Sequence, residues 1–169
     1  LWLYVMTEGQ KMRVRVLFNP ELDPDRVFQQ MRSAAALSTG GMQGTGILAG
    51  RHVAVPKVYN DFIFSFIGES TGFMGCIGVI VLLLAIAFKI LYDARVSKDN
   101  VGRLLCVGVF AMIISQTIIN LGMCLSLLPV IGVTLPLLFA GGSSVLSMYL
   151  GLGVVLSVYR HSKSPLFYV

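Results

Sequence analysis

Charged side chains are scarce in this sequence. Lys, Arg, Asp and Glu together make up 12% of the 169 residues, whereas an ordinary soluble domain has about 25%. Hydrophobic residues reach 56%, which leaves too little polar surface to coat a water-soluble fold. Lipid is therefore the expected solvent for much of the chain.

The sequence also lacks the residue groupings of several functional classes. Its three cysteines are far apart and form no CxxC pair, so neither a disulfide framework nor a zinc site is supported, and we expect them to be packing residues. The two histidines, His52 and His161, have no catalytic or metal-ligating partners close in sequence. Basic residues do not alternate with aromatic ones, so no nucleic-acid partner is expected.

Three long apolar runs are present instead, at residues 72–92, 104–128 and 135–159. Each has roughly the 20 residues that an α-helix needs to cross the hydrocarbon core. Helices also satisfy every backbone polar group within one segment, as lipid requires. The sequence thus predicts an all-α membrane protein, with a large loop in residues 1–71 and a bundle of three transmembrane helices plus a short tail in residues 72–169.

The ends of the predicted helices suggest how the chain is oriented. The first residues, LWLYVM, are too short to span and lack a basic flank, so we expect them to end an earlier helix and the chain to be the C-terminal part of a polytopic protein. Basic residues exceed acidic ones in the loop 93–103 and in the tail YRHSKS, which marks both as cytoplasmic. Residues 7–71 are then expected to be extracytoplasmic.

Within the long loop, the motif DPD at residues 23–25 is typical of a helix start, with an acceptor side chain at the cap and proline in the first turn. We expect an amphipathic helix over residues 24–38 that lies flat on the membrane surface. Gln30 would fall on its polar face. Its apolar face would contain Val27, Met31, Ala34 and Ala35.

Two further segments have more than one interpretation. The glycine-rich stretch 38–51 is either a flexible loop or a phosphate cradle, and its spacing fits no nucleotide-binding motif. The uncharged loop 126–136 is either a turn packed on the bundle or a segment that dips into the membrane beside a lipid substrate. Gln116 and Asn120, inside the second apolar run, need polar partners in the bundle interior.

Asp61 is the carboxylate in the most unusual setting, among phenylalanines just before the first apolar run. A desolvated carboxylate at a membrane surface would suit a general base. Spacing alone favours another interpretation, in which Asn60 or Asp61 is the N-cap of the helix that follows. Glu69 has a similar alternative, as a partner of a backbone amide or an arginine.

Several separated motifs occur in one order along the chain, and together they resemble a known family over residues 15–160. The motifs are GG-x-x-G-x-G from residue 40, NDFIFSFIGE-x-x-G-x-x-G from residue 60, Q-x-x-x-N-x-G-M from residue 116, LLP-x-x-G-x-x-LP from residue 127 and GGSS from residue 141. The chain resembles the C-terminal part of the SEDS proteins, the FtsW/RodA/SpoVE group of bacterial cell-wall polymerases.

This resemblance implies a function. The whole protein would be a multi-pass peptidoglycan glycosyltransferase of the bacterial inner membrane that polymerises lipid II with inversion, in cell-wall synthesis, cell division or cell-shape control. It would act with a class B penicillin-binding protein among the membrane lipids, and this chain alone would be inactive. A lipid II flippase and a non-catalytic scaffold for that transpeptidase are the alternatives.

The resemblance also implies the site residues. The family's essential aspartate matches Asp61, which would take the proton from the acceptor sugar's hydroxyl. A leaving diphosphate needs positive charge beside it, so Arg51 and Lys57 are expected substrate contacts, together with Asn60 and Glu69. A divalent cation is compatible with this reaction, but no carboxylate cluster in the sequence marks a metal site.

Overall fold

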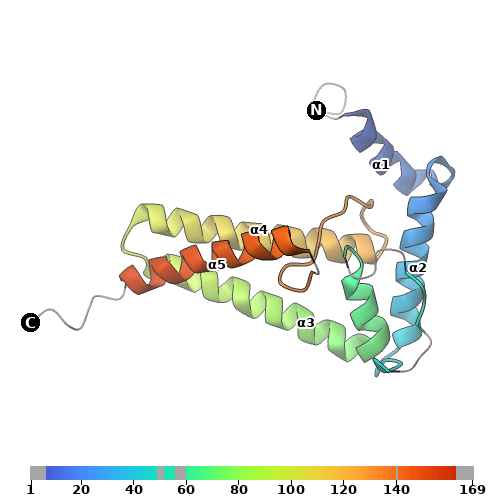
Figure 1. Ribbon diagram of the computed structural model, residues 1–169. Coiled ribbons are helices and arrows are strands. Elements are labelled where there is room, and N and C mark those ends of the chain that lie inside the picture. Colours follow the sequence, from blue (N-terminus) through green and yellow to red (C-terminus); the bar gives the residue numbers. More distant parts are fainter. Residues whose placement is uncertain (1–6, 49–51, 56–59, 140, 163–169) are drawn as a thin grey trace, which may run out of the picture.

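The computed structural model describes residues 7–48, 52–55, 60–139 and 141–162 (Figure 1). The helices in chain order are α1 (Glu8–Phe18), the short 3-10 helix η1 (Pro20–Leu22), α2 (Pro24–Gly40), α3 (Ile63–Val96), α4 (Asn100–Cys124) and α5 (Gly142–Ser162). The described residues form no β-strand, so the predicted all-α class is confirmed. Residues 1–6, which were expected to end an earlier helix, and the tail from residue 163 lie outside the described residues.

The three long helices α3, α4 and α5 lie side by side as a bundle (Figure 1), and each is long and apolar enough to cross a membrane. Asp99 starts α4 by accepting a hydrogen bond from the Gly102 amide at 3.3 Å. At the same end of the bundle, Lys89 pairs with Asp93 and lies 4.5 Å from the centre of the Tyr159 ring, which links α3 to α5. The three cysteines are free and buried, as packing residues would be.

The helix bounds differ from the apolar runs for local reasons. α3 begins at Ile63, ahead of its apolar run, and is broken at Gly72, where φ is 72° and ψ is −169°. α4 ends at Cys124 because Ser126 has a positive φ of 58°. α5 begins at Gly142 rather than residue 135, since the positive φ of Leu137 keeps the preceding apolar residues in a loop.

Helix α2 crosses the end of the bundle, and the first segment of α3, residues 63–71, runs alongside it (Figure 1). Pro24 opens α2 as the sequence predicts, with Asp25 in the first turn. Gly41, with a φ of 53°, follows the last residue of the helix, as is common for a glycine after a helix end. The expected helix is thus present and two residues longer than predicted.

The face of α2 that contacts the bundle is not the predicted apolar face, because Met31, Ala34 and Ala35 are exposed. Gln30 and Ser33, both polar, are buried against α4 and α3, whereas Met31 is 66% exposed. Gln30, which the sequence places on the polar face of the helix, is therefore buried against the bundle. The physical reason is a hydrogen bond, because the Gln30 amide donates to the Leu128 carbonyl at 2.7 Å, just past the end of α4.

Candidate active site

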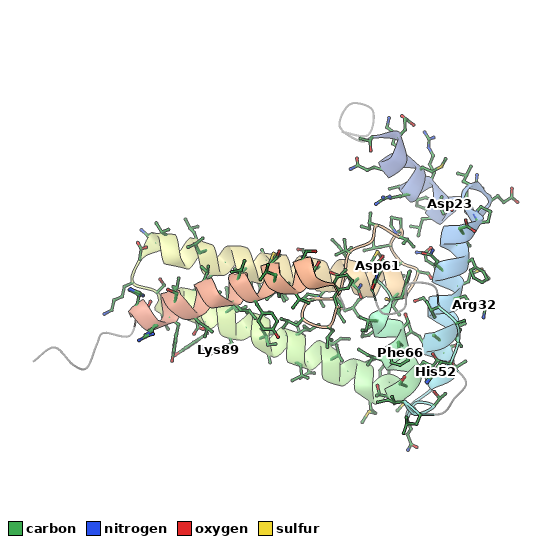
Figure 2. All side chains as sticks on the ribbon, viewed as in Figure 1. Asp23, Arg32, His52, Asp61, Phe66 and Lys89 are labelled. Carbon is green, nitrogen blue, oxygen red and sulfur yellow. The ribbon has the colours of Figure 1, made fainter. Side chains whose placement is uncertain are left out.

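Asp61 lies in the turn before α3, at the end of the bundle that α2 crosses (Figure 2). The N-cap residue of α3 is Phe62, and among the described residues no side chain caps the helix. The interpretation of Asn60 or Asp61 as an N-cap is therefore wrong. The Asp61 side chain is half-buried, and within the part of the chain that the structure describes its carboxylate takes part in no hydrogen bond or ion pair.

Asn120 of α4 fixes the backbone of Asp61. Its side chain is fully buried, and its Nδ2 donates to the Asp61 carbonyl at 2.7 Å and to the Val133 carbonyl at 2.8 Å. These two bonds use both N–H donors of the amide. The expectation that Asn120 needs polar partners inside the bundle is thus confirmed. One side chain holds the turn before α3 against the loop after α4.

A second buried polar contact supports the turn that carries Asp61. The hydroxyl groups of Ser33 in α2 and Ser65 in α3 lie 2.5 Å apart, and Ser33 Oγ donates to the Cys124 carbonyl at 3.0 Å. All three residues are fully buried. Because satisfied polar groups in a dry interior strengthen one another, three helices are locked together close to Asp61.

The loop after α4 turns back into the bundle, and Leu135 and Pro136 are fully buried. Gly132 has a φ of 77°, and a Cβ at this position would lie 3.6 Å from Asp61 Oδ2. Residues of the same loop line a cavity of about 220 Å³ between α4 and α5. Its polar lining comes from Gln116, Thr134, Ser143, Ser144 and Ser147. The loop is therefore packed on the bundle and also lines a cavity, and its entry into the membrane beside a lipid substrate stays a prediction.

The glycine-rich loop after α2 fills the break in α3. The amides of residues 45–46 donate to the carbonyls of residues 69–70 at 2.8 and 2.9 Å, before the break. After the break, the Phe73 amide donates to the Gly41 carbonyl at 2.9 Å. The loop thus supplies hydrogen bonds that the helix loses at Gly72. The amides of residues 44–46 are thus bonded within the fold, which argues against a phosphate cradle at these residues, whereas residues 49–51 of the stretch lie outside the described residues.

Glu69 is buried at the end of the first segment of α3, with 2% of its surface exposed. Its Oε1 accepts a hydrogen bond from the Val53 amide at 2.7 Å and lies 3.7 Å from His52 Nδ1. The His52 ring lies beside Phe66, with 5.3 Å between ring centres (Figure 2). Glu69 therefore ties residues 52–55 to α3, which matches the expected alternative of a backbone amide partner.

Replacing Glu69 by alanine is expected to lower the unfolding free energy of the full-length protein by about 1–3 kcal/mol, because the Val53 amide loses its acceptor. Glu69→Gln keeps an acceptor oxygen and is expected to lose less. Thermal unfolding in detergent measures both effects. Two variants as stable as the wild type, but both deficient in binding lipid II, the substrate that the resemblance implies, would instead support a direct substrate contact.

The remaining predicted contact residues are placed as follows. Asn60 is exposed in the turn beside Asp61. Arg51 and Lys57 lie outside the described residues. No group of three or more His, Cys, Asp or Glu side chains within the described ranges is arranged to hold a metal ion.

Arg13 of α1 contacts the loop that passes Asp61, although the sequence analysis did not predict it as a site residue. Its Nη1 donates to the Ile131 carbonyl at 3.2 Å, one residue before Gly132. The two residues are 118 positions apart, so no local pattern could have revealed the contact. The structure thus brings one basic side chain to the loop that passes Asp61.

Asn120→Asp is expected to reduce the activity of the full-length protein at least tenfold. The variant keeps the shape of the side chain but turns an acceptor oxygen toward the Asp61 and Val133 carbonyls, so two buried hydrogen bonds become repulsive contacts. Ser115→Ala, on an exposed position of the same helix, is the matched control. Turnover of lipid II, the substrate that the resemblance implies, measures the effect in purified protein, and wild-type activity of Asn120→Asp would contradict the positioning role.

The chain is similar in sequence to proteins of known name. Peptidoglycan glycosyltransferase MrdB of Escherichia coli strain K12 is 32% identical over 96% of this chain and 45% of its own length. Stage V sporulation protein E of Bacillus subtilis strain 168 is 35% identical over 89% of the chain and 42% of its own length. The chain therefore spans less than half the length of these relatives.

Two solved structures resemble the fold. A chain from a study of the structural coordination of polymerization and crosslinking by a peptidoglycan synthase complex has a TM-score of 0.72 and 30% identity, over 94% of this chain and 44% of that one. A mutant of the rod shape determining protein RodA of Thermus thermophilus has a TM-score of 0.63 and 33% identity, over 76% of this chain and 40% of that one. The family model of the FtsW/RodA/SpoVE cell cycle proteins matches residues 1–164. The chain belongs to the FtsW/RodA/SpoVE family of cell cycle proteins.

Proposed function

We propose that the whole protein polymerises lipid II into glycan strands, and that this chain supplies its general base, Asp61. The observation that carries the proposal is the carboxylate itself, which does not cap α3 although Asn120 fixes its backbone. A carboxylate that the fold does not use, on a backbone that is fixed, is suited to chemistry. The names of relatives such as peptidoglycan glycosyltransferase MrdB support the same conclusion.

In the proposed reaction, Asp61 takes the proton from the hydroxyl of the acceptor sugar. The hydroxyl oxygen attacks the anomeric carbon of the lipid-linked donor and forms the new glycosidic bond with inversion. The bond from this carbon to the diphosphate breaks, and its electron pair leaves with the diphosphate. The leaving group needs no proton, so the site must supply one base and a positive charge.

The bundle also supports an orientation, with Asp61 at the extracytoplasmic end and the C-terminus in the cytoplasm. The turn between α3 and α4 and the last residues of α5 lie at the other end (Figure 1). That end carries Arg95, Lys98, Arg103 and Arg160. Short basic loops stay on the cytoplasmic side, so the long segment before α3 is assigned to the outside of the inner membrane.

The proposed partner is a class B penicillin-binding protein, which would cross-link the strands. The similarity to a chain of a peptidoglycan synthase complex supports this partner. The chain alone is expected to be inactive, because it spans 45% of the length of its Escherichia coli relative and supplies only part of a substrate cavity.

A flippase that moves lipid II across the membrane is the second candidate, favoured by the polar cavity between α4 and α5. Vesicles that contain the full-length protein and fluorescent lipid II separate the two functions. Glycan product without lipid movement is expected. Movement without product would favour the flippase, and neither activity, in a protein that still restores growth through its transpeptidase partner, would favour the scaffold.

A further inference from the structure

The three basic residues of helix α1 have different surroundings. Lys11 is buried and paired with Glu8, with Nζ 2.8 Å from Oε1. Arg15 lines a shallow hollow together with Phe18 at the C-terminal end of the helix. Arg13 instead donates to the Ile131 carbonyl at 3.2 Å. Residues two apart on a helix point to different sides, so Arg13 and Arg15 serve different surfaces.

The contact with Ile131 places the Arg13 guanidinium on the loop that passes Asp61. The next residue, Gly132, passes the carboxylate so closely that a Cβ there would lie 3.6 Å from Asp61 Oδ2. Asn120 fixes this part of the loop to the Asp61 backbone through the Val133 carbonyl. The Arg13 guanidinium thus binds residue 131, and the Asp61 carboxylate lies beside residue 132. The buried Asn120 side chain binds residue 133.

We propose that Arg13 binds the diphosphate of the lipid-linked donor, beside the general base. This inference rests on the proposed function and adds the cation that the reaction needs. A guanidinium has five N–H donors in a planar fork, and the Ile131 carbonyl accepts one of them, which leaves others for phosphate oxygens. A fixed cation stabilises the charge that develops on the departing diphosphate.

The separation of the two groups suits an inverting displacement. The attacking and leaving oxygens lie on opposite sides of the anomeric carbon, so the base and the cation must be near each other but not paired. Asp61 and Arg13 suit this arrangement, because they come from different elements, Arg13 binds the Ile131 carbonyl and the next residue, Gly132, passes beside the Asp61 carboxylate. Figure 2 shows Asp61 at the end of the bundle nearest to α1.

Equilibrium binding to the full-length protein in phosphatidylcholine nanodiscs tests the assignment, with a polyprenyl diphosphate and the uncharged polyprenol as probes. Arg13→Gln is expected to weaken diphosphate binding about tenfold, or about 1.4 kcal/mol, and to leave polyprenol binding unchanged. Arg13→Lys keeps the charge but not the fork and is expected to restore part of the affinity. Arg15→Gln is the matched control and should bind both probes as the wild type does.

Three results would overturn the proposal. The first is unchanged diphosphate binding by Arg13→Gln. The second is an equal loss for both probes, which would mean that Arg13 only holds the loop. The third is competition by phosphatidylglycerol in the wild type that Arg13→Gln abolishes, which would assign the residue to ordinary lipid headgroups. Binding is measured without turnover, so a wild type that forms no glycan would contradict the proposed function and leave this test intact.

Discussion

Asp61→Asn is expected to lower the rate of lipid II polymerisation by the full-length protein about 10²- to 10⁴-fold, the usual contribution of a general base. The amide has nearly the same shape as the carboxylate but cannot take the acceptor proton. Asn120 bonds the backbone carbonyl of Asp61 rather than its side chain, so the substitution leaves the clamp in place. The variant should therefore fold and bind lipid II normally. Single-turnover assays with purified protein measure the chemical step.

Two controls make this result specific. Asn60→Ala changes the exposed neighbour of Asp61 and is expected to retain most of the activity. Asp61→Ala tests the scaffold alternative in cells, because a variant that restored growth and shape in a depleted strain would show that the carboxylate is dispensable. Polymerisation by Asp61→Asn at the wild-type rate would place the base elsewhere.

The spans were predictable because lipid imposes a simple requirement on sequence. A helix that crosses the hydrocarbon core must be apolar over about 20 residues, and α3, α4 and α5 each contain such a run. Their exact bounds depend on contacts that hydropathy does not encode. Residues 135–139, for example, belong to the third apolar run but form a loop in which Leu137 has a φ of 66°.

The contact face of α2 was not predictable for a related reason. Burial of Gln30 and Ser33 is favourable because carbonyls at and beyond the end of α4 accept their hydrogen bonds. These partners are 98 and 91 positions away in sequence. An analysis that sorts residues into apolar and polar faces assigns such side chains to the solvent.

The site was predicted in part. Spacing alone favoured a capping role for Asp61, and the family resemblance identified it as the base, a role that stays a proposal. Asn120 was singled out as a polar residue in an apolar helix, although its partners were unknown. The contact of Arg13 had no signal in the sequence, because it joins α1 to the loop after α4, and η1, α2, α3 and α4 lie between them in the chain.

Gly72→Ala is expected to destabilise the full-length protein by about 3–5 kcal/mol, enough to remove most of the folded material. Gly72 has φ 72° and ψ −169°, a conformation that is essentially restricted to glycine. An added Cβ would also lie 2.4 Å from the Gly44 amide nitrogen, within the loop that supplies the hydrogen bonds missing from α3. The loop would have to move, and the carbonyls of residues 69–70 would lose their donors.

Gly78→Ala separates this effect from glycine replacement in general. Gly78 lies six residues further along the same helix, and an added Cβ there meets nothing within 4 Å. Because alanine favours a helix interior by about 0.5–1 kcal/mol over glycine, this variant should be at least as stable as the wild type. Size-exclusion profiles and thermal unfolding of the two variants in detergent measure the difference. Equal stability of Gly72→Ala and Gly78→Ala would mean that α3 can run unbroken through residue 72, and the first segment would then no longer hold Asp61 where α2 crosses the bundle.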